Sequence, residues 1–298
     1  MSQKNQDYRP RAIVHDRFGP PRDVLALRHT EVRDPGRGEL LVRVLVRPIH
    51  PGDIALVVGP GTGRTPAPRI PGLEGVGVVV KTGDHVNGRH EGERVAFFPV
   101  EGAWSDLVVV PSDLCVSVPD EVSDATASLA LVNPIAGQLL MSEVKAAWGG
   151  PPAPFVQTAA GSSVGKLLTA HAARLGLPLV NIVRSRGGAI LLNERFPSIP
   201  TITTSDHDWE QQVTTALGGP ATAVVDAVGG EYTRPLLDLL GDGGAYITYG
   251  ALAGPSLDFD AFSVIGRGLR VHGVTISRWL AARTAEERAE DTTGAMFL

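Results

Sequence analysis

A run of small residues from Gln157 to Gly165 limits what this chain can fold into more than any other segment. It follows the short apolar stretch 154–157 and precedes apolar residues that recur at helical spacing over 164–175. A buried strand, a small-residue turn and a helix are therefore predicted in succession. Small side chains let the backbone approach a phosphate, and the free N–H groups at a helix N-terminus attract its charge. This arrangement predicts a cradle for a dinucleotide pyrophosphate, formed by Ala160, Gly161, Ser162, Ser163, Val164 and Gly165. Because only the last glycine fits a GxGxxG register, a plain Gly/Ser-rich loop is the alternative.

The segment after this predicted helix supports the prediction of a phosphate cradle. Residues 177–183 read as a second buried strand, which ends in Arg184, Ser185 and Arg186. Sites that prefer NAD place an acidic residue at this strand end, where it binds the ribose hydroxyls. Two arginines would instead bind a 2′-phosphate through charge-assisted hydrogen bonds, so NADPH is the predicted cofactor. The alternative is a pair of solvated surface arginines.

Two kinds of sequence follow each other along the 298 residues. Residues 11 to about 120 are rich in Gly, Pro and Val, and turn signals separate short strand-like runs, which predicts a mainly β region. From about 124 to 276, strands alternate with helical patterns, which indicates βαβ units and a parallel, doubly wound sheet. We therefore predict an α/β protein with a β-rich domain, 1–123 with 277–298, and a Rossmann domain, 124–276.

Individual elements are expected inside the second region. We predict helices near 208–217 and 231–240 and strands at 223–226, 245–249 and 269–276. Asp226 ends one of these strands, at the sheet edge where ligands bind, although a structural cap is the commoner role for such a residue.

Composition excludes several classes of function. The net charge is −5, with 27 basic and 32 acidic residues dispersed along the chain, so no nucleic-acid or membrane-binding footprint is expected. The single cysteine, Cys115, rules out an intramolecular disulfide and a multi-cysteine zinc site within one chain. The N-terminal segment is polar and lacks the apolar core of a secretory signal, which favours a cytoplasmic location.

Several short motifs together resemble the medium-chain dehydrogenase/reductase superfamily, in its zinc-free branch of 2-enoyl thioester reductases and quinone reductases. The resemblance covers nearly the whole chain and implies a GroES-like fold for the β-rich domain. Its marks are Ile49-His50-Pro51-Gly52-Asp53, Pro71 to Gly77, Gly92-Glu93-Arg94-Val95, Val132-Asn133-Pro134, the loop Ala159 to Gly165, Val183 to Arg186 and Ser277-Arg278-Trp279.

The resemblance implies an NADPH-dependent oxidoreductase that reduces an activated C=C bond, such as that of an enoyl thioester or enone, without zinc. A quinone reductase and a non-catalytic NADPH-binding protein are the alternatives. It also implies cofactor contacts at Asn133, Tyr249 and Gly250, and a substrate pocket bordered by Trp279. Asn133 could equally be a simple turn, Tyr249 a packed strand-end residue and Trp279 part of the core.

Two differences from known relatives concern the chemistry. Alcohol dehydrogenases of the superfamily bind zinc with a His-Glu pair, and the histidine of that pair is Leu73 here; leucine cannot bind a metal, so no metal site is expected. A tyrosine that the family uses as proton donor or oxyanion partner is missing from the stretch 59–63. The remaining candidates for that role are Thr62, His50, Tyr249 and solvent.

The resemblance also bears on partners. In the resembled family the Rossmann sheets pair edge to edge, and residues 269–276 alternate as such an edge strand would, so a homodimer acting on a small-molecule substrate is expected.

Overall fold

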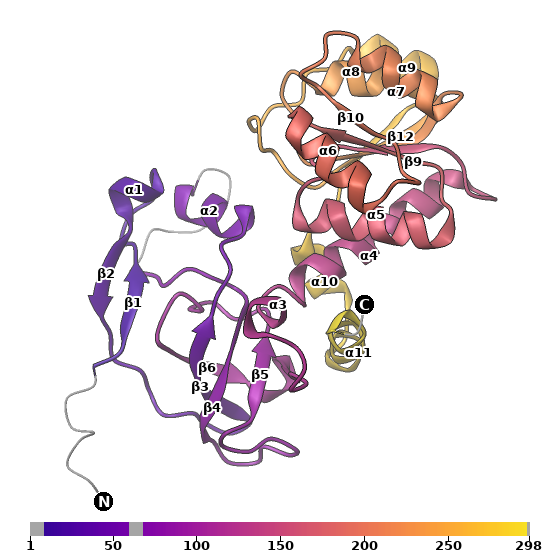
Figure 1. The fold of residues 1–298 in the computed structure, drawn as a ribbon. Helices are drawn as coiled ribbons and strands as arrows, with labels where there is room; N and C mark the ends of the chain where they lie inside the picture. The colour runs from indigo at the N-terminus through magenta and orange to yellow at the C-terminus, as the bar shows by residue number, and fades with distance from the viewer. Residues whose placement is uncertain (1–8, 60–67, 297–298) are drawn as a thin grey trace, which may run out of the picture. The chain divides into compact units, whose positions relative to one another are not determined.

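The computed structural model describes residues 9–59 and 68–296, and the chain divides into two compact units. Unit 1 comprises Met1–Val132 with Arg283–Leu298, and unit 2 comprises Asn133–Ala282 (Figure 1). These boundaries differ from the predicted divisions at 123/124 and 276/277. Helix α3 (Asp124–Ala127) packs against two strands of unit 1, which keeps the chain in that unit beyond residue 124.

Unit 1 is built on a five-stranded antiparallel sheet in the order β6-β3-β4-β5-β7, beside a β1–β2 hairpin. Apolar residues alternate along β3, so Leu40, Val42 and Val44 face the core together with Val95 and Phe97. The elements are β1 (Arg11–Val14), α1 (Pro21–Val24), β2 (Ala26–His29), β3 (Glu39–Val46), α2 (Pro51–Val58), β4 (Gly75–Thr82), β5 (Arg94–Phe97), β6 (Leu107–Pro111), η2 (Ser112–Leu114), β7 (Cys115–Ser117), α3 and α11 (Ala285–Met296).

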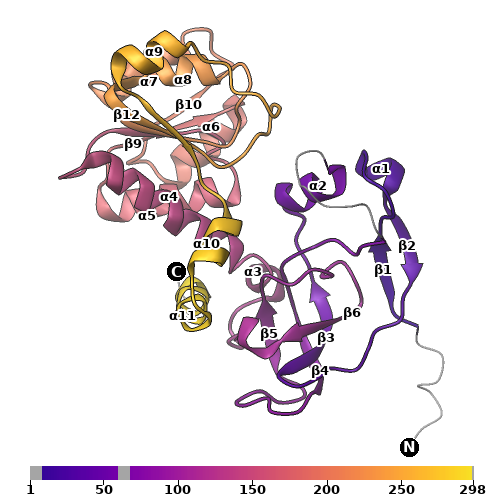
Figure 2. The ribbon, with the colours of Figure 1, turned by 180° about the vertical axis from the view of Figure 1, so that it is seen from behind.

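Unit 2 is an α/β layer structure around six parallel strands in the order β10-β9-β8-β11-β12-β13 (Figure 2). The strand order reverses between β8 and β11, which is the position where doubly wound sheets bind ligands. The elements are α4 (Val132–Trp148), β8 (Phe155–Gln157), α5 (Ser163–Leu175), β9 (Leu179–Val183), α6 (Arg186–Arg195), β10 (Thr201–Thr203), α7 (Trp209–Leu217), β11 (Ala221–Asp226), α8 (Thr233–Asp238), β12 (Leu240–Thr248), α9 (Ala261–Arg267), β13 (Arg270–Gly273) and α10 (Ile276–Ala282).

Both faces of this sheet are covered, as a parallel sheet requires. Helices α4 and α5 contribute Leu140 and Leu168 to one core cluster, while α7 and α8 contribute Val213 and Leu236 to the other. Strand residues alternate between the two clusters: Val156 joins the second and Phe155 the first. The predicted Rossmann fold is confirmed.

One predicted element is wrong in its extent. The strand expected over 269–276 is β13, Arg270–Gly273, and α10 already begins at Ile276. Pairing with β12 ends at the Thr248–Gly273 pair, and after the Val274 N–H donates to the Thr248 carbonyl oxygen the chain enters α10. No helix in the described ranges is long and apolar enough to cross a membrane.

Candidate dinucleotide site

The loop between β8 and α5 has the geometry of a phosphate cradle. The Ser162 hydroxyl caps α5 by accepting a hydrogen bond from the Gly165 N–H at 3.1 Å. Gly165 has no room for a side chain, because a Cβ there would lie 2.6 Å from the Ala159 carbonyl oxygen. Gly161, Ser162 and Ser163 are exposed, and a Cβ on Gly161 would meet nothing within 4 Å. The helix N-terminus is therefore open to an anion, and the pyrophosphate cradle stays a prediction.

The wall of the cradle is formed by the ends of β8 and β11. Asp226 is fully buried and accepts hydrogen bonds from the Thr158 hydroxyl (2.5 Å), the Tyr246 hydroxyl (2.6 Å) and two backbone N–H groups after β11. The Thr158 hydroxyl in turn accepts from the Ala227 N–H. Asp226 therefore holds the two strand ends together at the switch point. This is a structural role, which is commoner than ligand binding for an aspartate in this position.

Tyr249 lies at the end of β12, beside the cradle. Burial raises the pKa of its hydroxyl to about 12, although the neighbouring Ser162 hydroxyl lowers it. The hydroxyl is buried and has no hydrogen-bond partner of good geometry among the described residues. Gly250 is the next residue in the chain and is closely packed, because a Cβ there would lie 2.8 Å from the Ala227 carbonyl oxygen. An unsatisfied buried hydroxyl next to an open helix N-terminus fits a bound ligand with acceptor oxygens.

The arginines follow β9. Arg184, Ser185 and Arg186 are all exposed, and Ser185 caps α6 by accepting from the Gly188 N–H at 3.3 Å. Strand β9 is paired directly to β8, so these residues stand one strand away from the cradle. A second open helix N-terminus flanked by two cations fits a phosphate group.

Asn133 and Trp279 are buried, at 6% and 5% exposure. Asn133 lies in the first turn of α4 and Trp279 in α10. The roles predicted for Asn133 beside the cofactor and for Trp279 beside the substrate stay predictions.

In unit 1, His50 stands at the N-terminus of α2 and is held by two buried carboxylates. Its Nε2 lies 2.6 Å from Glu74 Oε2, and its backbone N–H donates to Asp53 Oδ2 at 2.8 Å. Burial lowers the pKa of His50, but the hydrogen bond and charge of Glu74, with the charge of Asp53, outweigh this and raise it. For Asp53, burial disfavours the charged carboxylate and raises its pKa.

Glu74 connects this histidine to a distant part of the chain. Its Oε1 accepts from the N–H groups of Leu131 and Val132, both at 2.9 Å. Glu74 therefore fixes the end of unit 1 where the chain enters α4, and His50 is the side chain it holds. The sequence gave no signal that Leu131 was the partner of Glu74. Thr62 lies outside the described residues.

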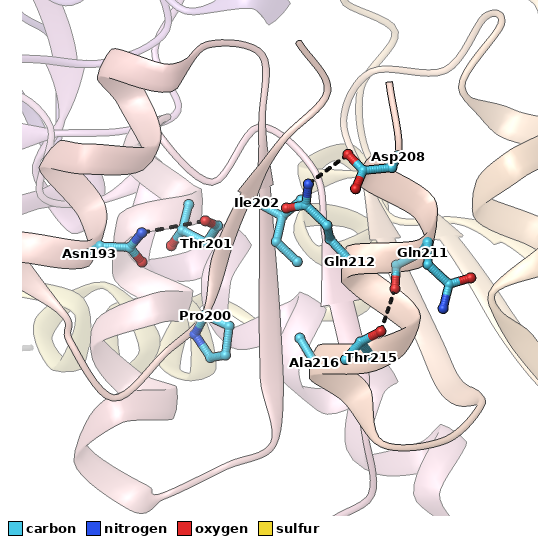
Figure 3. A pocket seen from close by; sticks show the side chains of 9 residues that line it. All are labelled: Asn193, Pro200, Thr201, Ile202, Asp208, Gln211, Gln212, Thr215 and Ala216. Carbon is cyan, nitrogen blue, oxygen red and sulfur yellow. Dashed lines mark hydrogen bonds between the residues drawn. The ribbon is translucent and has the colours of Figure 1, made fainter. Parts of the chain in front are cut away.

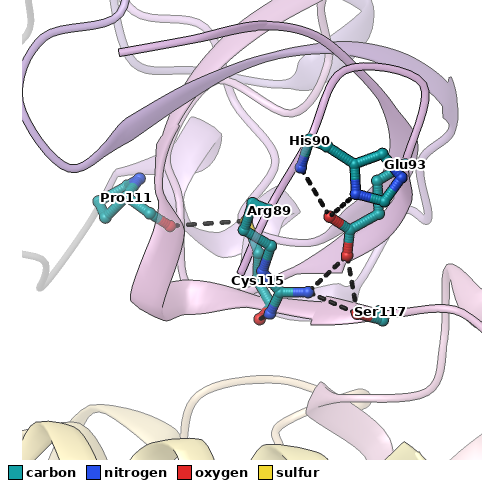
Figure 4. Close-up of polar contacts among 6 residues, drawn as sticks. All are labelled: Arg89, His90, Glu93, Pro111, Cys115 and Ser117. Carbon is teal, nitrogen blue, oxygen red and sulfur yellow. Dashed lines mark hydrogen bonds and ion pairs between the residues drawn. The ribbon is translucent and has the colours of Figure 1, made fainter. Parts of the chain in front are cut away.

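The single cysteine belongs to a structural cluster (Figure 4). Arg89 donates to Glu93 Oε1 (2.7 Å), to the Ser117 hydroxyl (2.5 Å) and to the carbonyl oxygen of Cys115. The Cys115 thiol is buried, and burial raises its pKa to about 12. These contacts tie the 89–93 turn to β7, and the thiol is too weakly acidic to act as a nucleophile.

A separate open groove of about 550 Å³ lies along β10 between α6 and α7 (Figure 3). Its polar side chains bond locally: Asn193 to the Thr201 carbonyl, Gln212 to Asp208, and Thr215 to the Gln211 carbonyl. Because these groups satisfy one another, the groove carries no set of converging groups for a ligand.

Comparison with known proteins agrees with this geometry. The alcohol dehydrogenase GroES-like domain matches residues 36–120. The mitochondrial enoyl-[acyl-carrier-protein] reductase of Xenopus tropicalis is 29% identical over 288 residues, covering 94% of this chain and 81% of the relative. A candidate NADPH:quinone reductase of Bacillus thuringiensis superposes with a TM-score of 0.86 at 27% identity, over 98% of this chain and 87% of that one.

The GroES-like domain match, the enoyl reductase relatives and the reductase structures together support the medium-chain dehydrogenase/reductase superfamily, in its zinc-free branch of enoyl thioester and quinone reductases. A quinone oxidoreductase of Pseudomonas syringae is a further structural neighbour, with a TM-score of 0.82 and 25% identity over 96% of this chain and 86% of that one.

Leu73 stands at the position expected for the superfamily's zinc-binding histidine. Leu73 precedes Glu74, whose two oxygens are occupied by His50 and by backbone N–H groups. Within the described ranges no three His, Cys, Asp or Glu side chains are grouped to hold a metal ion.

Proposed function

We propose that this protein is an NADPH-dependent reductase that adds hydrogen across an activated C=C bond, such as that of an enoyl thioester or an enone. The observation that carries the proposal is the open cradle at the N-terminus of α5 together with Arg184 and Arg186 at the end of β9. The enoyl reductase relatives support the substrate class.

When bound, NADPH supplies a hydride to the β-carbon, and the overall reaction also needs one proton at the α-carbon. The protein residues bind the pyrophosphate at Gly161 to Ser163 and the 2′-phosphate at the two arginines. We place Tyr249 at the cradle, beside the Ser162 hydroxyl, as a hydrogen-bond donor to the cofactor instead of the source of the proton. The proton then comes from water or from a hydroxyl such as Thr62.

His50 is the other candidate for the proton. Its raised pKa favours the imidazolium form, but Nε2 is already engaged by Glu74. We assign His50 a positioning role and keep solvent or Thr62 as the proton source.

Reduction of quinones is a second candidate function, and the missing family tyrosine favours it. A reduced quinone anion is more stable than an enolate, so its formation depends less on a positioned acid. The quinone reductase neighbours are consistent with this substrate class.

One experiment distinguishes these functions. Purified protein is mixed with NADPH and, in turn, with crotonyl thioesters, enones and quinones, and both NADPH consumption and the reduced product are measured. The Arg184→Ala/Arg186→Ala variant is the control for cofactor-dependent turnover. Saturated thioester as the main product supports the proposal, and turnover of quinones alone supports the second function. If NADPH binds but no acceptor is reduced, the protein is a non-catalytic member of the fold.

We further propose that the protein is a homodimer. Among the residues that the structure describes, β13 is an edge strand that pairs with β12 alone, and α9, shortly before it, exposes Phe262 (83%) and Ile265 (75%). An apolar helix face continuous with an unpaired strand edge suits a second copy of the same surface. The cytoplasmic location stays a prediction, since the curated relatives are named as mitochondrial.

A further inference from the structure

Arg186 is bound by a carboxylate that the sequence did not reveal. Its Nε and Nη2 donate to the same oxygen, Asp206 Oδ1, at 3.0 and 2.8 Å. The two residues differ in exposure: the side chain of Arg186 is 77% exposed and that of Asp206 only 23%. Asp206 is therefore the fixed partner and Arg186 the side chain that it holds.

The backbone around Asp206 explains why this carboxylate is fixed. Thr203 pairs with Val183 in the β9–β10 ladder, so the turn after β10 lies beside the residues after β9. The Asp206 N–H donates to the Thr203 carbonyl (3.2 Å), and the Asp206 carbonyl accepts from the N–H of the buried Trp209 (3.3 Å). The carboxylate thus stands on a hydrogen-bonded turn anchored by a core residue.

The pair leaves part of the arginine available. A guanidinium has five N–H donors, and the contact with Asp206 uses one on Nε and one on Nη2. The described part of the chain gives Arg186 no other hydrogen-bond acceptor, so both donors of Nη1 and one of Nη2 remain for a ligand. An arginine held in one orientation also loses less rotamer entropy when it binds a phosphate.

We propose that Asp206 is a positioning residue that orients the Arg186 guanidinium for the 2′-phosphate of NADPH and so sets the preference for NADPH over NADH. The inference rests on the proposed NADPH-dependent function. An opposite effect is conceivable on charge alone, because a carboxylate repels a phosphate. Asp206 and Arg186 largely neutralise each other at 2.8 Å, and water screens what is left at this exposed surface, so orientation outweighs repulsion.

Asparagine and alanine at position 206 separate these two effects. Asn keeps an oxygen that accepts from Arg186 but removes the charge, whereas Ala removes both. The dissociation constants of NADP⁺ and NAD⁺ are measured by calorimetry for the wild type, Asp206→Asn, Asp206→Ala, Arg186→Ala and the double variant Asp206→Ala/Arg186→Ala. Asp16→Ala, which breaks an exposed Arg–Asp pair in unit 1, is the matched control, and melting temperatures show that each variant folds.

We expect Asp206→Ala to weaken NADP⁺ binding by about three- to tenfold and to leave NAD⁺ binding unchanged. Asp206→Asn should bind NADP⁺ at least half as tightly as the wild type. In the Arg186→Ala background, loss of Asp206 should have no further effect, because the carboxylate acts through the arginine.

Other results overturn the inference. Equal or tighter NADP⁺ binding by Asp206→Ala would show that the carboxylate competes with the phosphate, and equal weakening of NADP⁺ and NAD⁺ would show a merely structural role. A wild type that binds neither nucleotide would instead refute the proposed function itself.

Discussion

In the proposed function, cofactor choice depends on Arg184 and Arg186. Replacing both with alanine should weaken NADPH binding by about 1.5–3 kcal/mol, the usual contribution of hydrogen bonds to a charged group. NADH binding should barely change, because NADH has no 2′-phosphate. Titration of both nucleotides measures this, with Arg174→Ala at the exposed C-terminal end of α5 as the control. An unchanged NADPH/NADH preference in the double variant would disprove the assignment.

Tyr249 makes a different prediction, about acid–base chemistry. With a pKa raised to about 12, its hydroxyl stays protonated throughout the neutral range and should produce no basic limb in the pH–rate profile between about pH 7 and 9. Tyr249→Phe should therefore keep turnover within about threefold of the wild type and mainly raise the KM for NADPH. Turnover of Thr62→Val on enoyl and quinone acceptors completes the test. A loss of more than about a hundredfold in Tyr249→Phe alone would make Tyr249 the proton donor.

At the scale of elements, Glu74 joins the start of β4 to His50 before α2 and to the chain that enters α4. Glu74→Ala leaves the N–H groups of the buried Leu131 and the half-buried Val132, and an imidazole, without their acceptor, so the free energy of unfolding should fall by about 2–4 kcal/mol. Chemical denaturation measures this change. The exposed Glu91→Ala should change it by less than about 0.5 kcal/mol, and similar losses in both variants would contradict this account.

The same contact makes stability depend on pH. The pKa of His50 is raised above its ordinary value of 6.5, so the folded state binds the proton more tightly than the unfolded state. Its stabilising contribution is complete below about pH 6 and is lost as the pH rises through the folded pKa. The difference in unfolding free energy between wild type and His50→Asn should therefore be larger at about pH 5.5 than at about pH 8.5. A difference that grew with pH would rule out the charged His50–Glu74 pair.

For the whole molecule, the exposed face of α9 and the edge strand β13 predict a dimer. Light scattering at micromolar concentration should give twice the mass of one chain, and Phe262→Glu/Ile265→Glu should give a monomer because it places charge in an apolar interface. Ile190→Glu/Leu191→Glu is a matched control, since these residues on α6 are also exposed. A monomeric wild type, or dissociation caused only by the α6 substitutions, would count against this interface.

Metal content is a second property of the whole molecule. Leu73 at the position of the family's zinc-binding histidine, with Glu74 fully occupied, predicts that the purified protein contains no stoichiometric zinc and that chelators leave its activity unchanged. Elemental analysis decides this. About one zinc per chain would require a ligand set that includes residues outside the described ranges.

The strand, turn and helix of the proposed dinucleotide site were predictable from the sequence because their signals are local. The small residues before Gly165 and the helical spacing after it describe a turn and a helix that are contiguous in the chain. The arginines were predictable for the same reason, since they directly follow an apolar strand. The end of the last strand was not predictable, because apolar alternation continues to Ile276 whereas the pairing with β12 stops at Gly273.

The sequence by itself determined the Rossmann cradle, the two kinds of domain and the cationic end of β9, because strand, turn and helix preferences act between near neighbours. Only the tertiary structure shows which side chains position the candidate functional residues. Glu74 meets Leu131 across 57 positions, and Asp206 meets Arg186 only because β10 pairs with β9. The tertiary structure also left the Tyr249 hydroxyl buried beside Ser162, where burial raises its pKa. Contacts of this kind depend on strand register and packing, and no local pattern in the chain encodes them.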